Sequence, residues 1–495
     1  MTTSIYWHDY EAWGADPRQD RASQFAGVRT DPDLNEIDAP LMIYCQSPVD
    51  RLPHPKACLI TGITPQYAQS HGLPEAEFVR LIHDQFSKPQ TCVAGYNNIR
   101  FDDELSRQLL YRNFYDPYER EWKNGNSRWD IIDMVRLCHA VRPEGINWPR
   151  LDDGSPVFRL ELLSRSNNLV HADAHDALSD VRATIALAKM VKEAQPKLYD
   201  FVFDLRSKHR VHALINLQEQ KPLLHISAIY PAKNSCIALV MPLAAHPLES
   251  NGVLMFNLGI DPSPWLDMSA EQLQQRLFVA QTDLPEGESR LPVNVLHSNR
   301  CPVIAPLSVL DVEKQQSLGI DTAKARRHWE LIRSNKNFVQ SLVLAYRNKT
   351  GTRENGTDPD NMLYGGGFFA DADKRLMTQL RQMSGSELAG QFDNLCAQGR
   401  DPRLPEMLFR YRARNFPATL SAEELQRWKL FCIQQCLNSG EDCGVTSIKP
   451  SQLNLAGCRL LIKQERELNP DASSQHILDE LEQWLQTLQQ WSGVV

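Results

Sequence analysis

Residues 91–104 read TCVAGYNNIRFDDE, and this stretch decides the class of fold that we expect. Residues 91–96 form a short apolar run that stops at two asparagines, which is typical of a buried strand. A helical pattern follows over residues 102–113. Further strand candidates are residues 5–9, 25–30 and 41–45, and further helix candidates are residues 130–141, 160–165 and a long helix ending near Val191. Strands followed by strand–helix alternation indicate an α/β domain built around a mixed sheet.

The composition is that of an ordinary globular protein. The chain has 495 residues and a formal net charge of −8, with 42% hydrophobic and 23% charged residues, which excludes collagen-like, disordered and disulfide-scaffold classes. Its 11 cysteines are scattered, and the N-terminus lacks the basic and apolar regions of a secretory signal. No window reaches the roughly 18 apolar residues that a membrane span needs. We therefore expect a cytoplasmic protein with reduced cysteines.

Two changes of pattern divide the chain. The first lies near Gln195 and Pro196 and predicts a first domain over residues 1–195. Short strand-like runs then predict a small β-barrel or sandwich over residues 196–350, with a helical stretch at 324–347. Those runs are residues 213–217, 223–228, 235–241, 252–257 and 293–296. Residues 348–361 are polar and rich in Gly and Asn, which is typical of an exposed linker before a helical domain at 351–495. Leucines at 3-4-3 spacing in residues 477–491 predict a helix face packed against the core.

Three groups of polar residues in the first domain are candidates for chemistry. Asp9 and Glu11 stand two apart at a strand end, so their side chains share one face, and such paired carboxylates bind Mg²⁺. Asp102 opens its helix, where backbone N–H groups hold a carboxylate. His175 and Asp180 converge if the histidine lies in the loop or first turn and the aspartate lies one turn in. Taken alone, each group also fits an ordinary role as solvated acids, a helix cap or a surface histidine.

Taken together, the order D-x-E, N-x-x-F-D and H-x4-D resembles the DEDDh exonucleases, which have a ribonuclease-H-like fold. The stretches that resemble the bacterial exodeoxyribonuclease I family in particular are HDYEAWG, LITGITPQ, GYNNIRFDDE, RNFYDPY, SRWDIIDM, RPEGINWP, FRLELL and, far downstream, FRYRARNFP. The resemblance covers nearly the whole chain and is strongest over residues 5–230. It implies an α/β, ribonuclease-H-like exonuclease domain at 1–195, an SH3-like β-barrel domain at 196–350 and an α-helical C-terminal domain at 351–495.

The resemblance implies processive 3′→5′ hydrolysis of single-stranded DNA to 5′-mononucleotides, in DNA repair and recombination. It also implies two-metal hydrolysis with two Mg²⁺ ions per active site, and with Mn²⁺ as an alternative. We expect Asp9, Glu11 and Asp180 to hold one ion, and Asp9 and Asp102 to hold the other. His175 is expected to take the proton from the attacking water, because its titration range near neutrality suits that role.

Substrate contacts are expected from cations and aromatic rings, which bind single strands by charge and stacking. Arg159, in the FRLE stretch, and Glu11 are candidates for the terminal nucleotide or a phosphate. Further candidates in family-like stretches, with ordinary packing or a solvated charge as the alternative, are Arg107, Tyr118, Trp122 and Arg136. Three arginines of FRYRARNFP either line the DNA path or pair with acids across a domain interface, namely Arg410, Arg412 and Arg414.

The resemblance also implies a protein partner, the acidic and hydrophobic C-terminal tail of single-stranded DNA-binding protein. Arg142 and Lys221 are candidate contacts for this tail. We expect a monomer without a membrane partner. Two other functions stay open: a DEDDh exoribonuclease, against which the long chain after the catalytic domain argues, and a catalytically silent protein that binds single strands, against which the full set of acids argues.

Overall fold

The computed structural model describes residues 3–169, 176–349, 358–437 and 453–492, so His175 lies outside the described residues. The chain forms two compact units. The first unit comprises Met1–Ser127, Ala172–Arg182 and Arg353–Val495, and the second comprises Arg128–His171 and Ala183–Thr352. No helix of the described residues is long and apolar enough to cross a membrane.

The first unit is built on a mixed sheet, as predicted. Its strands are β1 (Ser4–Ala12), β2 (Ala22–Thr30), β3 (Leu41–Tyr44) and β4 (Thr91–Gly95), in the order β3-β2-β1-β4. Strand β1 pairs antiparallel with β2 and parallel with β4. The expected strands are therefore confirmed. Strand β1 extends beyond the predicted residues 5–9, and both Asp9 and Glu11 pair with residues of β2 in the ladder.

Helices pack aromatic and aliphatic side chains against this sheet. They are α1 (Pro55–Thr61), α2 (Pro65–His71), α3 (Glu75–Phe86) and α4 (Asp102–Arg112). Phe78 and Phe86 of α3 and Leu105 of α4 join Tyr6 and Phe25 of the sheet in one buried cluster. Two elements carry the chain from one unit to the other, β5 (Ser127–Asp130) and α7 (Ala177–Ala194). The predicted helix over 130–141 thus begins later than expected, because its first residue closes β5.

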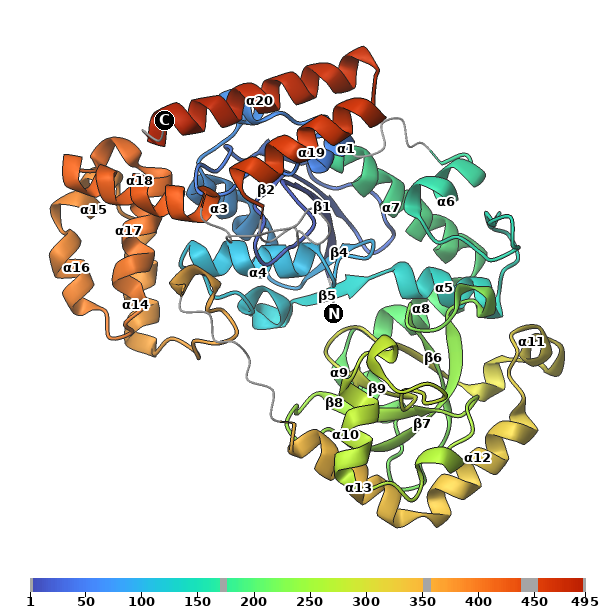
Figure 1. The fold of residues 1–495 in the computed structure, drawn as a ribbon. Helices are drawn as coiled ribbons and strands as arrows, with labels where there is room; N and C mark the ends of the chain where they lie inside the picture. The colour runs from blue at the N-terminus through green and yellow to red at the C-terminus, as the bar shows by residue number, and fades with distance from the viewer. Residues whose placement is uncertain (1–2, 170–175, 350–357, 438–452, 493–495) are drawn as a thin grey trace. The chain divides into compact units, whose positions relative to one another are not determined.

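The C-terminal part of the first unit is helical, as predicted (Figure 1). Its helices are α14 (Asp371–Leu380), α15 (Gly385–Gly390), α16 (Phe392–Gln398), α17 (Leu404–Asn415), α18 (Ala422–Leu437), α19 (Leu455–Leu468) and α20 (Ala472–Ser492). Helices α19 and α20 lie side by side next to α1 (Figure 1). The leucines spaced along α20, Leu478, Leu481, Leu485 and Leu488, are all buried in one cluster with Trp13, so this face packs against the core.

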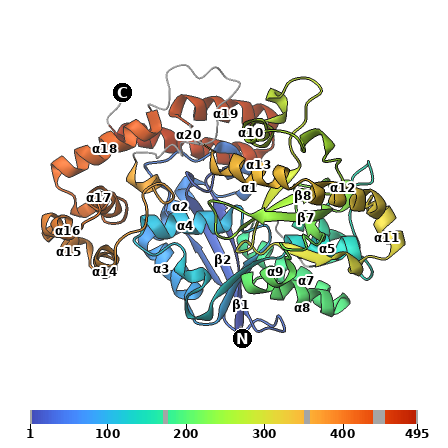
Figure 2. The same cartoon turned by 90° about the horizontal axis from the view of Figure 1, so that it is seen from below.

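The second unit is centred on an antiparallel sheet in the order β10-β6-β7-β8-β9. The strands are β6 (Leu223–Ile226), β7 (Ile237–Ala245), β8 (Gly252–Asn257), β9 (Val293–His297) and β10 (Val303–Pro306). The helices are α5 (Ile132–Val141), α6 (Leu160–Ser166), α8 (Pro196–Asp204), α9 (Lys208–Leu214), α10 (Ala270–Phe278), α11 (Val312–Ser317), α12 (Thr322–Ser334) and α13 (Lys336–Arg347). Figure 2 shows α13 beside the strands β7 and β8.

Three local predictions for the second and third domains are wrong or incomplete. The strand expected at residues 213–217 is the end of helix α9 and the loop after it, because Val211 and Leu214 pack as helical residues on the buried cluster beneath the sheet. The helical stretch at 324–347 is two helices, since the Asn335 side chain accepts from the Phe338 N–H and starts α13. In the expected linker 348–361, residues 350–357 lie outside the described residues, and Asp360 is buried by ion pairs rather than exposed.

Candidate active site

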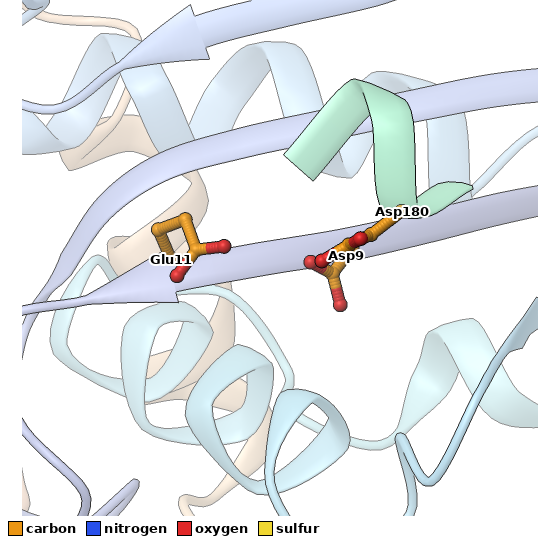
Figure 3. A group of neighbouring side chains, drawn as sticks. All are labelled: Asp9, Glu11 and Asp180. Carbon is orange, nitrogen blue, oxygen red and sulfur yellow. The ribbon is translucent and has the colours of Figure 1, made fainter. Parts of the chain in front are cut away.

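Three carboxylates meet at the end of β1. Asp9 and Glu11 project from the same face of β1, and Asp180 reaches them from the first turn of α7 (Figure 3). One oxygen from each residue can be chosen so that all three lie within 4.8 Å of one another, and each residue is half-buried. The alternation of a strand and the position of Asp180 one turn into its helix produce this grouping, as the sequence spacing predicts.

Asp102 lies beside these three carboxylates. It opens α4 directly after the strand β4 and the turn that follows, and it is buried. Its Oδ1 accepts a hydrogen bond of 3.1 Å from the backbone N–H of Tyr10, the residue between Asp9 and Glu11. This contact fixes the first turn of α4 against the centre of the acidic pair, so four acids from three distant parts of the chain lie together.

The acids raise one another's pKa. Burial raises the pKa of Asp9 well above its usual range, and the charges of Asp102, Glu11 and Asp180 raise it further. Burial likewise raises the pKa of Glu11 to about 8, with further contributions from Asp180 and Asp102. A cluster of this kind is destabilised unless protons or a cation offset its charge. Hard divalent cations bind to carboxylate oxygens, so the donor set fits Mg²⁺ or a similar ion.

Gln24 is a residue of this site that the sequence did not point to. It lies on β2 directly opposite Glu11 and is buried. Its Nε2 donates to Asp176 Oδ1 at 3.2 Å, and its Oε1 accepts from the Ala177 N–H at 3.4 Å, so it holds the start of the helix that carries Asp180. Only the pairing of β1 with β2 reveals this role, because a neutral residue in a strand carries no motif.

Three predicted substrate contacts lie in the first unit. Arg107 of α4 forms an ion pair of 2.8 Å with Glu121, and its guanidinium carbon lies 5.5 Å from the centroid of the Tyr118 ring. Trp122 is 64% exposed, which leaves its indole ring accessible for stacking. The contact therefore joins a cation of α4, the helix that begins at Asp102, to the ring of Tyr118, which lies beyond the end of that helix.

The other predicted contacts lie in the second unit. Arg159 is exposed at the residue before α6. Arg136 donates to Asp133 at 2.6 Å and lies 5.8 Å from the centroid of the Phe158 ring. Arg142 and Lys221, the candidate partner contacts, are both exposed.

The structure decides between the two interpretations of the FRYRARNFP arginines. Arg410 pairs with Asp358, Asp360 and Glu406, Arg412 pairs with Glu424, and Arg414 pairs with Asp50 and Asp360. All three side chains are at least nine-tenths buried. They therefore act as ion-pair partners, and Arg414 links the helical part to the sheet-bearing part through Asp50.

Comparison with protein families gives three consecutive matches. The model of the family described as Exonuclease matches residues 6–188, that of the Exonuclease I SH3-like domain matches residues 206–348, and that of the Exonuclease I C-terminal domain matches residues 357–488. Together with the mixed sheet, the antiparallel sheet and the helical C-terminal part, these matches confirm the predicted fold class.

Individual proteins are similar over most of the chain. Exodeoxyribonuclease I of Escherichia coli (strain K12) is 44% identical over 429 residues, which cover 86% of this chain and 88% of the relative. The structure of an exonuclease I from Methylocaldum szegediense has a TM-score of 0.88 at 47% identity and covers 98% of this chain and 99% of that chain. The structure of E. coli exonuclease I in complex with a dA16 oligonucleotide has a TM-score of 0.90 at 40% identity and covers 98% of this chain and all of that chain.

Proposed function

Because this chain belongs to the exodeoxyribonuclease I family, we propose that it removes nucleotides processively from the 3′ end of single-stranded DNA and releases 5′-mononucleotides. The observation that carries this proposal is the acidic cluster of Asp9, Glu11 and Asp180, whose oxygens lie within 4.8 Å of one another. The complex of the E. coli relative with dA16 supports a single strand as the substrate.

The proposed cofactor is Mg²⁺, with two ions per active site and Mn²⁺ as an alternative. Asp9, Glu11 and Asp180 would hold one ion, and Asp9 and Asp102 would hold the second; the raised pKa of Asp9 and of Glu11 supports a need for cationic charge there. Bound Mg²⁺ lowers the pKa of water and offsets the charge that develops on the scissile phosphate.

The protein's own groups hold this arrangement in place. The Tyr10 N–H orients Asp102, and Gln24 orients the first turn of α7 that carries Asp180. His175, five residues before Asp180, is proposed to accept the proton of the attacking water, a role that rests on the family motif and on the ordinary pKa of histidine near neutrality.

Substrate binding is proposed to use the predicted cations and rings. Arg159 is assigned to the terminal nucleotide or a phosphate, together with Glu11. Further contacts are assigned to Arg107, Tyr118, Trp122 and Arg136. The exposed indole of Trp122 and the contact of Arg107 with the Tyr118 ring support stacking and charge as the means of binding.

The deciding experiment uses one DNA oligomer labelled at its 3′ end and the same oligomer labelled at its 5′ end. With Mg²⁺, the 3′ label is expected to appear first as a mononucleotide, while the 5′-labelled strand shortens from its far end. EDTA is expected to stop both reactions. An RNA oligomer of the same sequence tests the exoribonuclease alternative, and faster degradation of RNA, or activity that persists in EDTA, contradicts the proposal.

The proposed protein partner is the acidic, apolar C-terminal tail of single-stranded DNA-binding protein. A pocket of about 370 Å³ in the second unit supports this assignment, because apolar side chains such as Val141 and Phe201 line it together with Arg142 and Lys197. Lys221 does not line this pocket, and its proposed role as a second contact rests on its exposure and on the family resemblance. A synthetic tail peptide is expected to bind the wild type and to bind Arg142→Ala at least about tenfold more weakly. Loss of one charged contact reduces the binding free energy by at least this amount. Equal affinities contradict the assignment.

The remaining parts of the proposal concern the protein as a whole. We assign domains to residues 1–195, 196–350 and 351–495, close to the ends of the family matches at 188, 206, 348 and 357. We also propose that it is a monomer and acts in DNA repair and recombination. For its proposed place in the cytoplasm, a reducing compartment, the support is that the ten described free cysteines form no disulfide among themselves.

A further inference from the structure

Arg18 is an exposed cation in the loop that follows the strand of Asp9 and Glu11. It lies in the loop that joins β1 to β2, and its side chain is 66% exposed. Its Nε lies 3.6 Å from Glu104 Oε1, and its guanidinium carbon lies 5.5 Å from the centroid of the Tyr364 ring. The guanidinium makes no hydrogen bond to any of the described residues, so its five N–H donors are available to another acceptor.

The loop that carries Arg18 is held by its own hydrogen bonds. The Arg18 backbone N–H donates to Asp16 Oδ1 at 3.0 Å, and the Asp16 N–H donates to Asp20 Oδ2 at 2.8 Å. A Cβ atom on Gly14 would lie 2.2 Å from Asp20 Oδ2, so the loop closes tightly around this carboxylate. Arg18 is therefore presented from a rigid support, which reduces the entropy lost when it binds a ligand.

Glu104 does not need Arg18 as a partner. Its Oε2 accepts a hydrogen bond of 2.5 Å from the Tyr364 hydroxyl, and its Oε1 accepts one of 2.9 Å from Gln108 Nε2. Arg107 supplies a second cation at 3.7 Å. The carboxylate thus keeps its partners and its counter-charge if Arg18 turns away, and an ion pair whose arginine is 66% exposed stabilises the fold little.

The position of Arg18 relates it to the reaction. Its loop continues from β1, which carries Asp9 and Glu11, and Glu104 lies two residues after Asp102 in the first turn of α4. A single strand of DNA that enters this acidic cluster brings phosphates, whose negative charge needs cations nearby. The contact with Tyr364 holds the guanidinium by its π-face and leaves its N–H groups free for phosphate oxygens.

We propose that Arg18 leaves Glu104 when substrate binds and contacts a phosphate of the single strand, as an affinity-determining residue of the exonuclease. This inference rests on the proposed function. A phosphate contact strengthens binding for every base sequence and makes it depend on salt. The alternative is a surface ion pair with Glu104 alone, which does not touch DNA.

The test measures binding of a fluorescent oligo-dT in EDTA, where the strand stays intact, over a series of KCl concentrations. Each phosphate contact with a single strand adds about 0.7 to the slope of log K against log[salt]. Arg18→Gln is expected to lower the magnitude of this slope by about 0.7 and to weaken binding several-fold at low salt, whereas Arg18→Lys keeps the wild-type slope. Arg80→Gln is the matched control, because Arg80 is an exposed arginine paired only with Glu77 and Asp84 among the described residues.

Cleavage kinetics with Mg²⁺ give a second readout. Arg18→Gln is expected to raise KM and leave kcat unchanged, since the contact forms in the ground state and in the transition state alike. If the wild type binds and degrades single strands and Arg18→Gln has the same salt slope and KM, the role of Arg18 is overturned while the proposed function stands. If the wild type does not degrade single strands, the proposed function falls and the role of Arg18 falls with it.

Discussion

The backbone N–H of Tyr10 donates a hydrogen bond of 3.1 Å to Asp102 Oδ1, across 92 residues of sequence. Tyr10 separates Asp9 from Glu11 on β1, and Asp102 opens α4, so this single contact aligns two of the sequence motifs. It uses one lone pair of Asp102 and leaves the second oxygen outside this bond. Asp102 is therefore oriented by the main chain of the strand whose side chains it complements.

Asp102→Ala is expected to abolish most of the cleavage and to spare binding. Loss of a partner around a metal site costs at least about 10–100-fold, and Asp102 is assigned to an ion directly, so kcat should fall by about a hundredfold or more. Affinity for a single strand in EDTA should stay within a few-fold of wild type, because the removed charge repels phosphate. The measurement is single-turnover cleavage beside fluorescence anisotropy.

A matched acidic change keeps this prediction specific. Asp84→Ala removes an exposed aspartate of α3, which pairs with Arg80 and lies outside the candidate site. It should cleave at the wild-type rate. Near wild-type cleavage by purified, folded Asp102→Ala would remove Asp102 from the active site.

Glu11→Gln is expected to stabilise the protein in EDTA and to weaken the effect of Mg²⁺. Burial and the charges of Asp180 and Asp102 raise the pKa of Glu11 to about 8, so the native state resists an ionisation that the unfolded chain undergoes freely above its ordinary pKa near 4.5. Native stability is therefore lost as pH rises from about 4.5 towards 8 in the absence of a cation. The substitution Glu11→Gln removes this loss of stability, because the amide does not ionise.

The measurement is the melting temperature at pH 7 in EDTA and in Mg²⁺. When the concentration of Mg²⁺ is about a hundred times its dissociation constant, binding adds about 2.7 kcal/mol to the free energy of unfolding of the wild type. The same concentration is expected to add less to the free energy of unfolding of the variant. Glu423→Gln is the control, because Glu423 is exposed at the start of α18. A variant that melts below the wild type in EDTA and still gains the full Mg²⁺ stabilisation contradicts the metal cluster.

Much of the site follows from local spacing, whereas the ion pairs do not. Asp9 and Glu11 share a face because strand residues alternate, and Asp180 reaches them because it lies one turn into α7. Nothing local reveals that Arg414 pairs with Asp50, 364 residues away, so the arginines of FRYRARNFP fitted two interpretations equally well.

The errors in the fold have a similar origin. The apolar residues of the run at 213–217 predict a strand, yet helix α9 continues to Leu214, because Val211 and Leu214 pack on the same buried cluster at helical spacing. Strand β10 was missed because its four residues gain their partner only when β6 lies alongside. Short apolar runs carry too little periodicity to separate helix from strand without their neighbours.

Arg414→Met is expected to destabilise the fold strongly. Its Nη2 donates to Asp50 Oδ2 at 2.9 Å and pairs with Asp360, and both carboxylates are buried. Removing one partner of a buried pair leaves charge uncompensated and costs about 3–5 kcal/mol. Chemical denaturation measures this loss.

Arg427→Met is the control for the loss of an arginine from this helical region. Arg427 is 55% exposed and pairs with Glu406, so its removal should cost less than about 1 kcal/mol. If both variants lose the same small stability, the buried pairs do not join the helical part to the sheet.

The same buried acids predict a loss of stability in acid. Burial alone would raise the pKa of Glu75, but Arg112, whose Nη2 lies 3.0 Å away, and Arg21 lower it from its ordinary value near 4.5 to about 2. Burial also opposes the lowering at Asp360, where Arg414 and Arg410 bring the pKa to about 2. Since these pKa values lie below those of the unfolded chain, the stabilisation is complete above pH about 4.5 and is lost as pH falls towards 2. The free energy of unfolding, measured between pH 6 and pH 3, should therefore fall steeply in the wild type and less steeply in Glu75→Gln, whose side-chain amide binds no proton in this range. Parallel pH profiles for the two proteins would show that the Glu75–Arg112 pair does not cause the loss of stability in acid.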